Sequence, residues 1–173
     1  MRQLRQELAI SDQHNRLYHF TDVRNLPSIR KHGLLSVAQL EARRIEVAAP
    51  GGNQWSREAD ARLGMQHFVH LCLLPEHPME YRAKQDGRLG ETIFLRVRPA
   101  VLNVDGVLFT DAVANKADVI PRSIEHIDNH LDHEVIYRRT DWKDPEVRER
   151  RNRLKKFEIL IPDQVPVLML EGL

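Results

Sequence analysis

Residues 17–35 read LYHFTDVRNLPSIRKHGLL, and they carry the clearest local structural signal in the chain. The apolar opening, residues 17–20, predicts a short strand. Asn25 has the side-chain type of a helix N-cap, Pro27 falls in the first helical turn, and Gly33 suits the left-handed position at a helix end. The stretch therefore predicts a strand, a turn, a short helix and a glycine stop, in that order.

The rest of the chain consists of short apolar runs separated by short polar or amphipathic segments. Further strands are predicted at residues 67–74, 91–98, 101–104, 107–110, 157–162 and 165–170. Further helices are predicted at residues 2–9, 40–45, 56–63 and 144–155. Strands and helices do not alternate regularly, which is typical of an α+β fold. The length of 173 residues fits one domain spanning residues 1–173.

The composition excludes several classes of protein. Apolar residues make up 42% and charged residues 29% of the chain, an ordinary mixture for a soluble domain. No apolar run approaches the roughly 18 residues that a membrane helix needs. Cys72 is the single cysteine, so an intramolecular disulfide framework is excluded. We therefore expect a cytoplasmic protein without a membrane segment.

The charge is balanced overall but uneven along the chain. The 26 basic and 25 acidic residues do not by themselves indicate nucleic-acid binding. Between residues 138 and 156, however, nine basic residues outnumber four acidic ones. On composition alone, a solvated helix face of mixed charge is the favoured interpretation. The alternative is a surface that meets phosphate.

Signals for metal, nucleotide-loop or thiol chemistry are weak. His67 and His70 lie on a predicted strand, where residues three apart point to opposite faces. His126, His130 and His133 have helical spacing but lie in a polar segment, so we expect no metal site. Neither a GxxxxGK[ST] nor a GxGxxG motif occurs. The cysteine lies inside an apolar run, where a buried inert thiol is the common outcome.

Polar positions on two predicted strands are candidates for function. Glu158 lies in the apolar run FEILI, and an acid on a core strand costs free energy unless it is paired or functional. Exposure at the edge of a sheet is an equally good interpretation of Glu158. His19 and Thr21 share one strand face because they are two residues apart. They form either a structural pair or a pair that points into a cleft.

Taken in order, these segments resemble the DarT family of DNA ADP-ribosyltransferases. The first similar segment is residues 17–35, and the second runs from VHL at residues 69–71 through PEHPMEY at residues 75–81. The third is FTD at residues 109–111. The last is DPEVRE at residues 144–149, followed by FEILI at residues 157–161 and VP at residues 165–166. The resemblance extends from residue 17 to about residue 167.

This resemblance implies an ADP-ribosyltransferase-like core, in which two small packed β-sheets and short flanking helices surround a cleft for NAD. Glu158 would be the catalytic glutamate, because a fixed carboxylate stabilises the positive charge that develops on the ribose. Arg57 would act with it by holding phosphate and positioning NAD, and Arg62 is the second choice for that contact. The residues implied in NAD binding are His19, Thr21, Asn25, Gly33, Leu35 and Arg62.

The implied reaction transfers ADP-ribose from NAD, as co-substrate, to a base of single-stranded DNA. The basic helix would contact DNA phosphate through Arg148, Arg151 and Arg153. Residues 71–73 read LCL where thymidine-modifying members have an aromatic run, so the base is left as thymine or guanine. Such enzymes usually act as toxins in toxin–antitoxin or phage-defence systems. A neutralising macrodomain or another ADP-ribosyl hydrolase is therefore an implied partner.

Two other functions remain open for the same residues. An RNA 2′-phosphotransferase-like enzyme shares the fold and consumes NAD, but its chemistry does not rely on a catalytic glutamate. A catalytically inactive module would only bind nucleic acid or a protein. Activity that survives replacement of Glu158 would favour the first alternative, and failure to consume NAD would favour the second.

Overall fold

The computed structural model describes residues 1–10, 16–116 and 118–173. The helices in these residues are α1 (Arg2–Ile10), α2 (Leu26–His32), α3 (Val37–Ala42), α4 (Gln54–Leu63), α5 (Pro78–Gln85), α6 (His133–Tyr137) and α7 (Pro145–Leu154). The strands are β1 (Leu17–Asp22), β2 (Leu34–Leu35), β3 (Phe68–Cys72), β4 (Thr92–Val97), β5 (Leu108–Thr110), β6 (Arg122–Ser123), β7 (Glu158–Pro162), β8 (Gln164–Val165) and β9 (Leu170–Glu171).

One large antiparallel sheet organises these elements. Its strand order is β6-β5-β7-β3-β1-β4-β9, and β2 pairs with β8 in a separate two-stranded sheet. The predicted α+β fold is confirmed. In the described part of the chain, however, the strands divide into one large seven-stranded sheet and a two-stranded sheet, rather than two small sheets. The strands β7, β3 and β1 are consecutive neighbours near the middle of the large sheet.

The register of these central strands brings together residues that are far apart in the sequence. Tyr18 of β1 pairs with Cys72 of β3, and Cys72 pairs with Glu158 of β7. His19 and Thr21 point to the same side of β1 because side chains alternate along a strand. The candidate histidine and threonine on β1 and the glutamate on β7 therefore lie on the two strands that flank β3.

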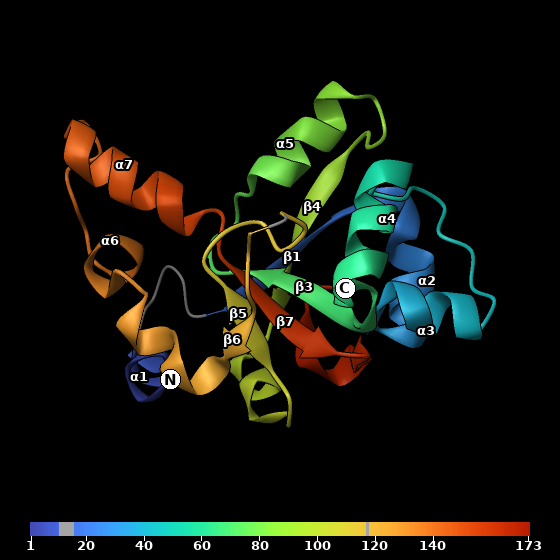
Figure 1. The fold of residues 1–173 in the computed structure, drawn as a ribbon, viewed down its shortest axis with the longest axis horizontal. Helices are drawn as coiled ribbons and strands as arrows, with labels where there is room; N and C mark the ends of the chain where they lie inside the picture. Colours follow the sequence, from blue (N-terminus) through green and yellow to red (C-terminus); the bar gives the residue numbers. More distant parts are fainter. Residues whose placement is uncertain (11–15, 117) are drawn as a thin grey trace.

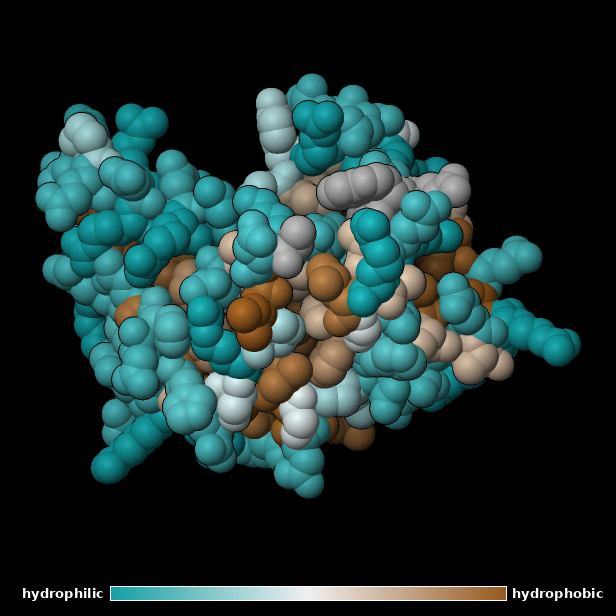
Figure 2. All heavy atoms as spheres, viewed as in Figure 1, coloured by the Kyte–Doolittle hydropathy of each residue, from teal (hydrophilic) through white to brown (hydrophobic). Residues whose placement is uncertain are grey.

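The helices surround the sheet in separate groups (Figure 1). In this view α2, α3 and α4 lie on the right, beside β1 and β3, and α5 rises at the top. On the left lie α1, α6 and α7, with α7 tied to α6 by ion pairs from Arg150 to Asp132 and Glu134. Figure 2 shows hydrophilic side chains over this left-hand part and apolar ones gathered toward the middle of the same face. The basic helix α7 is thus held at one side of the sheet, where most of its surface meets solvent.

The apolar core joins the strands to the flanking helices. Leu17, Leu71 and Ile159, from the three central strands, are completely buried. Leu4 of α1 and Leu154 of α7 are also completely buried in the same cluster. Fully burying a leucine side chain contributes about 1.5–3 kcal/mol. Leu4 and Leu154 therefore anchor α1 and α7 to the core.

The predicted strand, turn and short helix at residues 17–35 are present, with two differences. Gly33 ends α2 with a positive φ of 76°, but its ψ of −166° lies outside the predicted left-handed helical region, in a conformation essentially confined to glycine. Asn25 stands at the N-cap position of α2, but its backbone is helical and its side chain does not cap the helix. Asp22 caps the preceding 3₁₀ turn (Val23–Asn25) instead, by accepting from the Arg24 backbone N–H. The amide of Asn25 is thereby free for other partners.

Two further segments differ from the sequence-based prediction, and a third is left open by it. A proline stands at the start of two of these segments and interrupts the other. Residues 101–104 fall in a 3₁₀ helix (Pro99–Asn103) that begins at a proline, rather than in a strand. Residues 165–170 are split into β8, a 3₁₀ turn (Val167–Met169) and β9, with Pro166 at the break. The segment around residues 79–82, ambiguous in sequence, is helical in α5 and starts at Pro78.

None of the helices in the described ranges combines the length and the hydrophobicity needed to cross a lipid bilayer.

Candidate active site

A cavity of about 790 Å³ opens beside the central strands. Its walls come from β1, α2, β2, α3, α4, β3 and the start of β7, together with the loop after α3. Pockets for small molecules usually occupy roughly 300–1,000 Å³. The predicted site residues that line it are Glu158, Arg57, His19, Thr21, Asn25, Gly33 and Leu35. Segments that are distant in the sequence thus converge on one space of suitable size.

Glu158 is a buried acid in the wall of this cavity. The residue is only 5% exposed, so exposure at a sheet edge is excluded. Its Oε2 accepts hydrogen bonds from His70 Nδ1 at 2.8 Å and from the Ala114 backbone N–H at 3.2 Å. Its Oε1 lies 3.4 Å from His77 Nε2. The acid is therefore paired by groups from β3, from the loop before α5 and from the loop after β5.

These partners keep the carboxylate ionised. Burial alone raises the pKa of Glu158, but the charge and hydrogen bond of His70, with help from His77 and Ala114, bring that pKa below its ordinary value. Burial likewise lowers the pKa of His70, but Glu158 and Asp60 bring it above its ordinary value. Both shifts describe a cationic His70 beside an anionic Glu158.

His77 approaches Glu158 as a neutral ring. It is the N-cap of α5, and its Nδ1 accepts from the Met79 backbone N–H at 3.3 Å. The ring proton must then lie on Nε2, the nitrogen that faces Glu158. Burial lowers the pKa of His77, and the ring stacks on Phe20 with centroids 5.8 Å apart. His77 therefore offers the carboxylate an N–H dipole rather than a charge.

His19 presents an acceptor to the cavity. Its Nδ1–H donates to the backbone carbonyl of His70 at 2.9 Å, since a carbonyl can only accept. Burial lowers the pKa of His19, which favours the neutral ring. Nε2 therefore carries a lone pair, and such an atom suits a hydroxyl donor such as a ribose OH.

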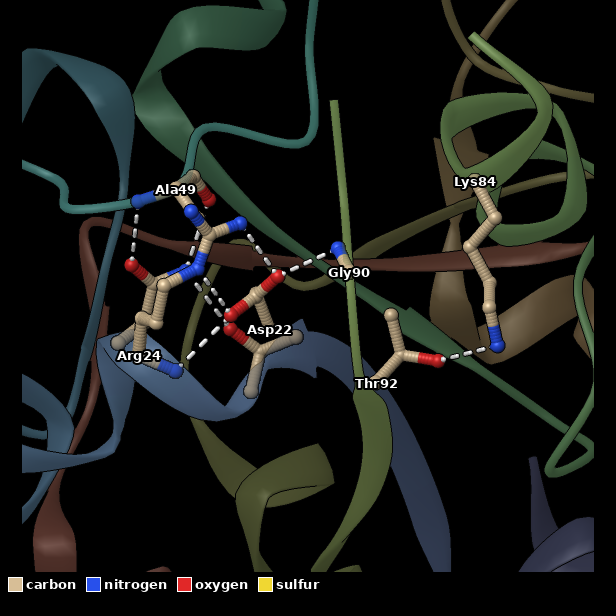
Figure 3. A network of polar contacts seen from close by, with 8 residues as sticks. Asp22, Arg24, Ala49, Lys84, Gly90 and Thr92 are labelled. Carbon is tan, nitrogen blue, oxygen red and sulfur yellow. Dashed lines mark hydrogen bonds and ion pairs between the residues drawn. The ribbon is translucent and has the colours of Figure 1, made fainter. Parts of the chain in front are cut away.

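Asn25 shapes the wall by holding a loop. Its Nδ2 donates to Thr21 Oγ1 at 3.2 Å and to the Ala49 carbonyl at 2.9 Å, while its Oδ1 accepts from the Ala49 N–H at 2.9 Å. Figure 3 shows this network beside Asp22, which accepts from both Arg24 and the Gly90 backbone N–H. Because the side-chain amide of Asn25 is hydrogen-bonded to Thr21 and Ala49, its role is to position the loop around Ala49.

Gly33 brings two chain segments together at the cavity edge. A Cβ on Gly33 would collide with the Val165 carbonyl oxygen, and the positive φ of Gly33 already disfavours other residues. This close approach sets β2 beside β8, where Leu34 pairs with Val165. Leu35, the next residue, then lines the cavity as an apolar surface.

The candidate arginines differ in where they lie. Arg57 and Asp60 are one turn apart on α4 and both line the cavity. Arg62 does not line it, because two residues beyond Asp60 the helix has turned by about 200°. Arg44, in the loop after α3, does line it and has a positive φ of 55°. Phosphate contacts from this side would therefore come from Arg57 and Arg44 rather than Arg62.

The three arginines predicted to contact DNA also differ, in their exposure and in their partners. Arg148 and Arg153 of α7 are exposed. Arg151 is 6% exposed and donates from Nε and Nη2 to Glu76 Oε1 at 3.0 and 2.6 Å, while its guanidinium lies 3.9 Å from the Trp142 ring centroid. A guanidinium that is already paired and stacked in this way is a scaffold group, so we remove Arg151 from the predicted DNA contacts.

Sequence reasoning missed the groups that complete the site. His70 was considered only as a metal ligand, and His77 and Asp60 were not considered. His77 before Pro78 has the pattern of an N-cap, but nothing in the sequence indicates that its ring meets Glu158. Among the described residues, no group of three or more His, Cys, Asp or Glu side chains is arranged to hold a metal ion.

Comparison with known proteins identifies relatives of this chain. A curated relative from Thermosipho africanus, a DNA ADP-ribosyl transferase–DNA ADP-ribosyl glycohydrolase fusion protein, is 28% identical over 108 residues. That match covers 59% of this chain and 28% of the relative, so the chain spans about a quarter of that protein's length.

Two solved structures of Thermus sp. 2.9 DarT share the fold. The complex with ADP-ribosylated single-stranded DNA matches with a TM-score of 0.65 and 21% identity, over 94% of this chain and 83% of that one. The complex with NAD⁺ matches with a TM-score of 0.56 and 23% identity, over 93% and 81% of the two chains. The sequence profile of the family described as "ssDNA thymidine ADP-ribosyltransferase, DarT" matches residues 18–173. The chain therefore belongs to the DarT family.

Proposed function

We propose that this protein transfers ADP-ribose from NAD to a base of single-stranded DNA and releases nicotinamide. The observation that carries the proposal is Glu158, an ionised carboxylate in the wall of a cavity large enough for a dinucleotide. Family membership supports the same reaction. The bound NAD⁺ and ADP-ribosylated single-stranded DNA of the two Thermus structures support the choice of substrates.

The chemistry follows from the charge on Glu158. Breaking the bond between ribose C1′ and nicotinamide sends the bonding electrons to nicotinamide and leaves positive charge on the ribose, which a fixed carboxylate stabilises. A nitrogen of the target base then bonds to C1′. The proton that this nitrogen loses passes to the Glu158 carboxylate, acting as general base.

The remaining wall residues would hold NAD in place. His19 Nε2 accepts from a ribose hydroxyl, and the Thr21 hydroxyl, which already accepts from Asn25, has its own proton to donate. The Arg57 guanidinium makes no hydrogen bond or ion pair with the described residues, so it is available for the pyrophosphate. Arg44 is a second phosphate contact from the opposite loop.

DNA would reach the cavity past α7. Arg148 and Arg153 are exposed on the helix that leads into Glu158, and arginines along a groove track phosphate. Thymine is the first base to test because the family is described by thymidine, and guanine is the second. We further propose a toxin role with a macrodomain or other ADP-ribosyl hydrolase as antitoxin, which the fusion of the two activities in the Thermosipho relative supports.

The test is mass spectrometry of single-stranded oligonucleotides, each carrying one base type, incubated with NAD and the protein. We expect a mass gain of one ADP-ribose on one base type. Glu158→Gln should lower the rate by about 10³-fold while NAD still binds. Modification of RNA alone, with activity that survives Glu158→Gln, would instead favour the RNA 2′-phosphotransferase-like alternative. No nicotinamide release at all would leave the inactive binding module.

A further inference from the structure

His70 is placed so that both of its ring nitrogens meet acceptors. Nδ1 lies 2.8 Å from Glu158 Oε2, and Nε2 lies 3.5 Å from the Met65 backbone carbonyl. A carboxylate oxygen and a carbonyl oxygen can only accept, so a ring that bonds to both must carry two N–H groups. Such a ring is an imidazolium cation. This geometry therefore favours a positive charge on His70.

The groups around His70 fit this charge. Glu158 of β7 faces one side of the ring, and Asp60 of α4 contributes a second negative charge from the cavity wall. One oxygen of Asp60, Oδ1, is buried without a hydrogen-bond partner among the described residues. The other titratable neighbours are His19 on β1 and His77 before α5, whose rings are neutral. Of these three histidine rings, His70 is thus the cationic one.

Glu158 needs such a cation because burial and a nearby acid oppose its ionisation, while the Ala114 N–H and His77 give the ionised form further support. The carboxylate is 5% exposed, and Cys72 lies directly across the sheet from it. Asp60 adds negative charge nearby, and Glu158 and burial together raise the pKa of Asp60. His77 supplies only a neutral dipole at 3.4 Å. Without the imidazolium of His70, burial would raise the pKa of this carboxyl, and a neutral acid can neither stabilise a cation nor accept a proton.

We propose that His70 is the positioning residue of the transferase reaction: its imidazolium fixes Oε2 of Glu158 and keeps the buried carboxylate ionised. This role rests on the function proposed above for Glu158. His70 itself acts through Glu158 and does not take part in bond making or breaking.

The first test is the pH dependence of nicotinamide release from NAD by His70→Gln, which keeps a hydrogen-bond donor but removes the charge. We expect the acid limb of kcat/KM to move up by about 1–2 pH units. Activity should return to near the wild-type level above that limb, where Glu158 ionises without help. KM for NAD should change less than twofold. His126→Gln, at an exposed position on a 3₁₀ helix, is the matched control and should leave the profile unchanged.

A merely structural role for His70 predicts a different result. Activity would then fall by the same factor at every pH, or KM would rise, and either outcome would overturn the proposal. An unshifted acid limb would do so as well.

The second test does not depend on activity. Nitrogen-15 NMR of the wild-type histidine rings at pH 6.5 should show both His70 nitrogens protonated, whereas a neutral His70 ring would overturn the proposal. The His70 signal is assigned by its loss in His70→Gln. A wild-type protein that releases no nicotinamide, yet shows this doubly protonated ring, would refute the proposed function and leave the ion pair established.

Discussion

Replacing Arg151 by alanine tests whether this residue belongs to the scaffold or to the DNA surface. The change removes two charge-assisted hydrogen bonds to Glu76 and the stacking on Trp142. Hydrogen bonds to charged groups contribute about 1.5–3 kcal/mol, and an exposed cation–π contact about 0.5–1 kcal/mol. Glu76 is 36% exposed and keeps Lys155 as a partner at 2.9 Å, so solvent screening and this second cation reduce the loss.

We therefore expect Arg151→Ala to lower the free energy of unfolding by about 2 kcal/mol, or Tm by about 4–8 °C for a chain of this size. Urea unfolding followed by far-UV circular dichroism measures the first quantity. Arg148→Ala, on the exposed side of the same helix, is the matched control and should stay within about 0.5 kcal/mol of wild type. A double-mutant cycle with Glu76→Gln should recover a coupling of about 1 kcal/mol or more between positions 76 and 151.

For DNA binding the expectation is reversed: Arg148→Ala should have an effect and Arg151→Ala should not. Arg148→Ala should reduce the slope of log Kd against log salt by about 0.7, the contribution of one phosphate contact on a single strand. Arg151→Ala should leave that slope unchanged. The reasoning would be refuted if Arg151→Ala were as stable as wild type and lost the same slope as Arg148→Ala. Arg151 would then have to leave Glu76 to reach phosphate.

Three further changes test the cavity wall and the buried ion pair. Asn25→Ala removes three hydrogen bonds at the loop around Ala49 and should cost about 2–3 kcal/mol in urea unfolding, whereas exposed Asn129→Ala should cost less than about 0.5 kcal/mol. Arg44→Gly relieves a positive φ at the end of α3 and should weaken NAD binding, measured by calorimetry, without lowering Tm; a lower Tm would contradict this. The His70–Glu158 pair should stabilise the fold fully between pH 4.5 and pH 6.5, the ordinary pKa values of its members. Its contribution should be lost as the pH falls through the lowered pKa of Glu158 or rises through the raised pKa of His70, and a pH–stability profile that Glu158→Gln leaves unchanged would contradict it.

The sequence predicted elements best where local rules suffice. Gly33 ends α2 with the positive φ that a helix end favours, and Asp144 caps α7 as its position before Pro145 predicts. Local rules failed where a tertiary contact competed for the same group. Asn25 has the side chain of an N-cap, but its amide satisfies the Ala49 backbone instead, and no local pattern records that loop.

The candidate site was predictable only in part for the same reason. Alternation along β1 placed His19 and Thr21 on one face, and the apolar neighbours of Glu158 marked it as unusual. Neither rule identifies a partner. His70 lies 88 residues before Glu158, and the two meet only because β3 and β7 pair with Cys72 opposite Glu158. Arg62, the second choice for the phosphate contact, lies on another face of α4 from Arg57 and does not line the cavity.

One loop joins the helix proposed to hold DNA to the carboxylate proposed to act on NAD. Glu76 binds Arg151 and Lys155 of the α7 segment, and the next residue, His77, places Nε2 3.4 Å from Glu158. Consecutive residues point in different directions from an extended backbone, so one short segment reaches both sides. The two ion pairs of Glu76 therefore tie α7 to the segment that places His77 beside Glu158. The buried Arg151 thus holds α7 next to the carboxylate proposed to act on NAD, and this structural link accounts for the burial of one arginine in a helix rich in them.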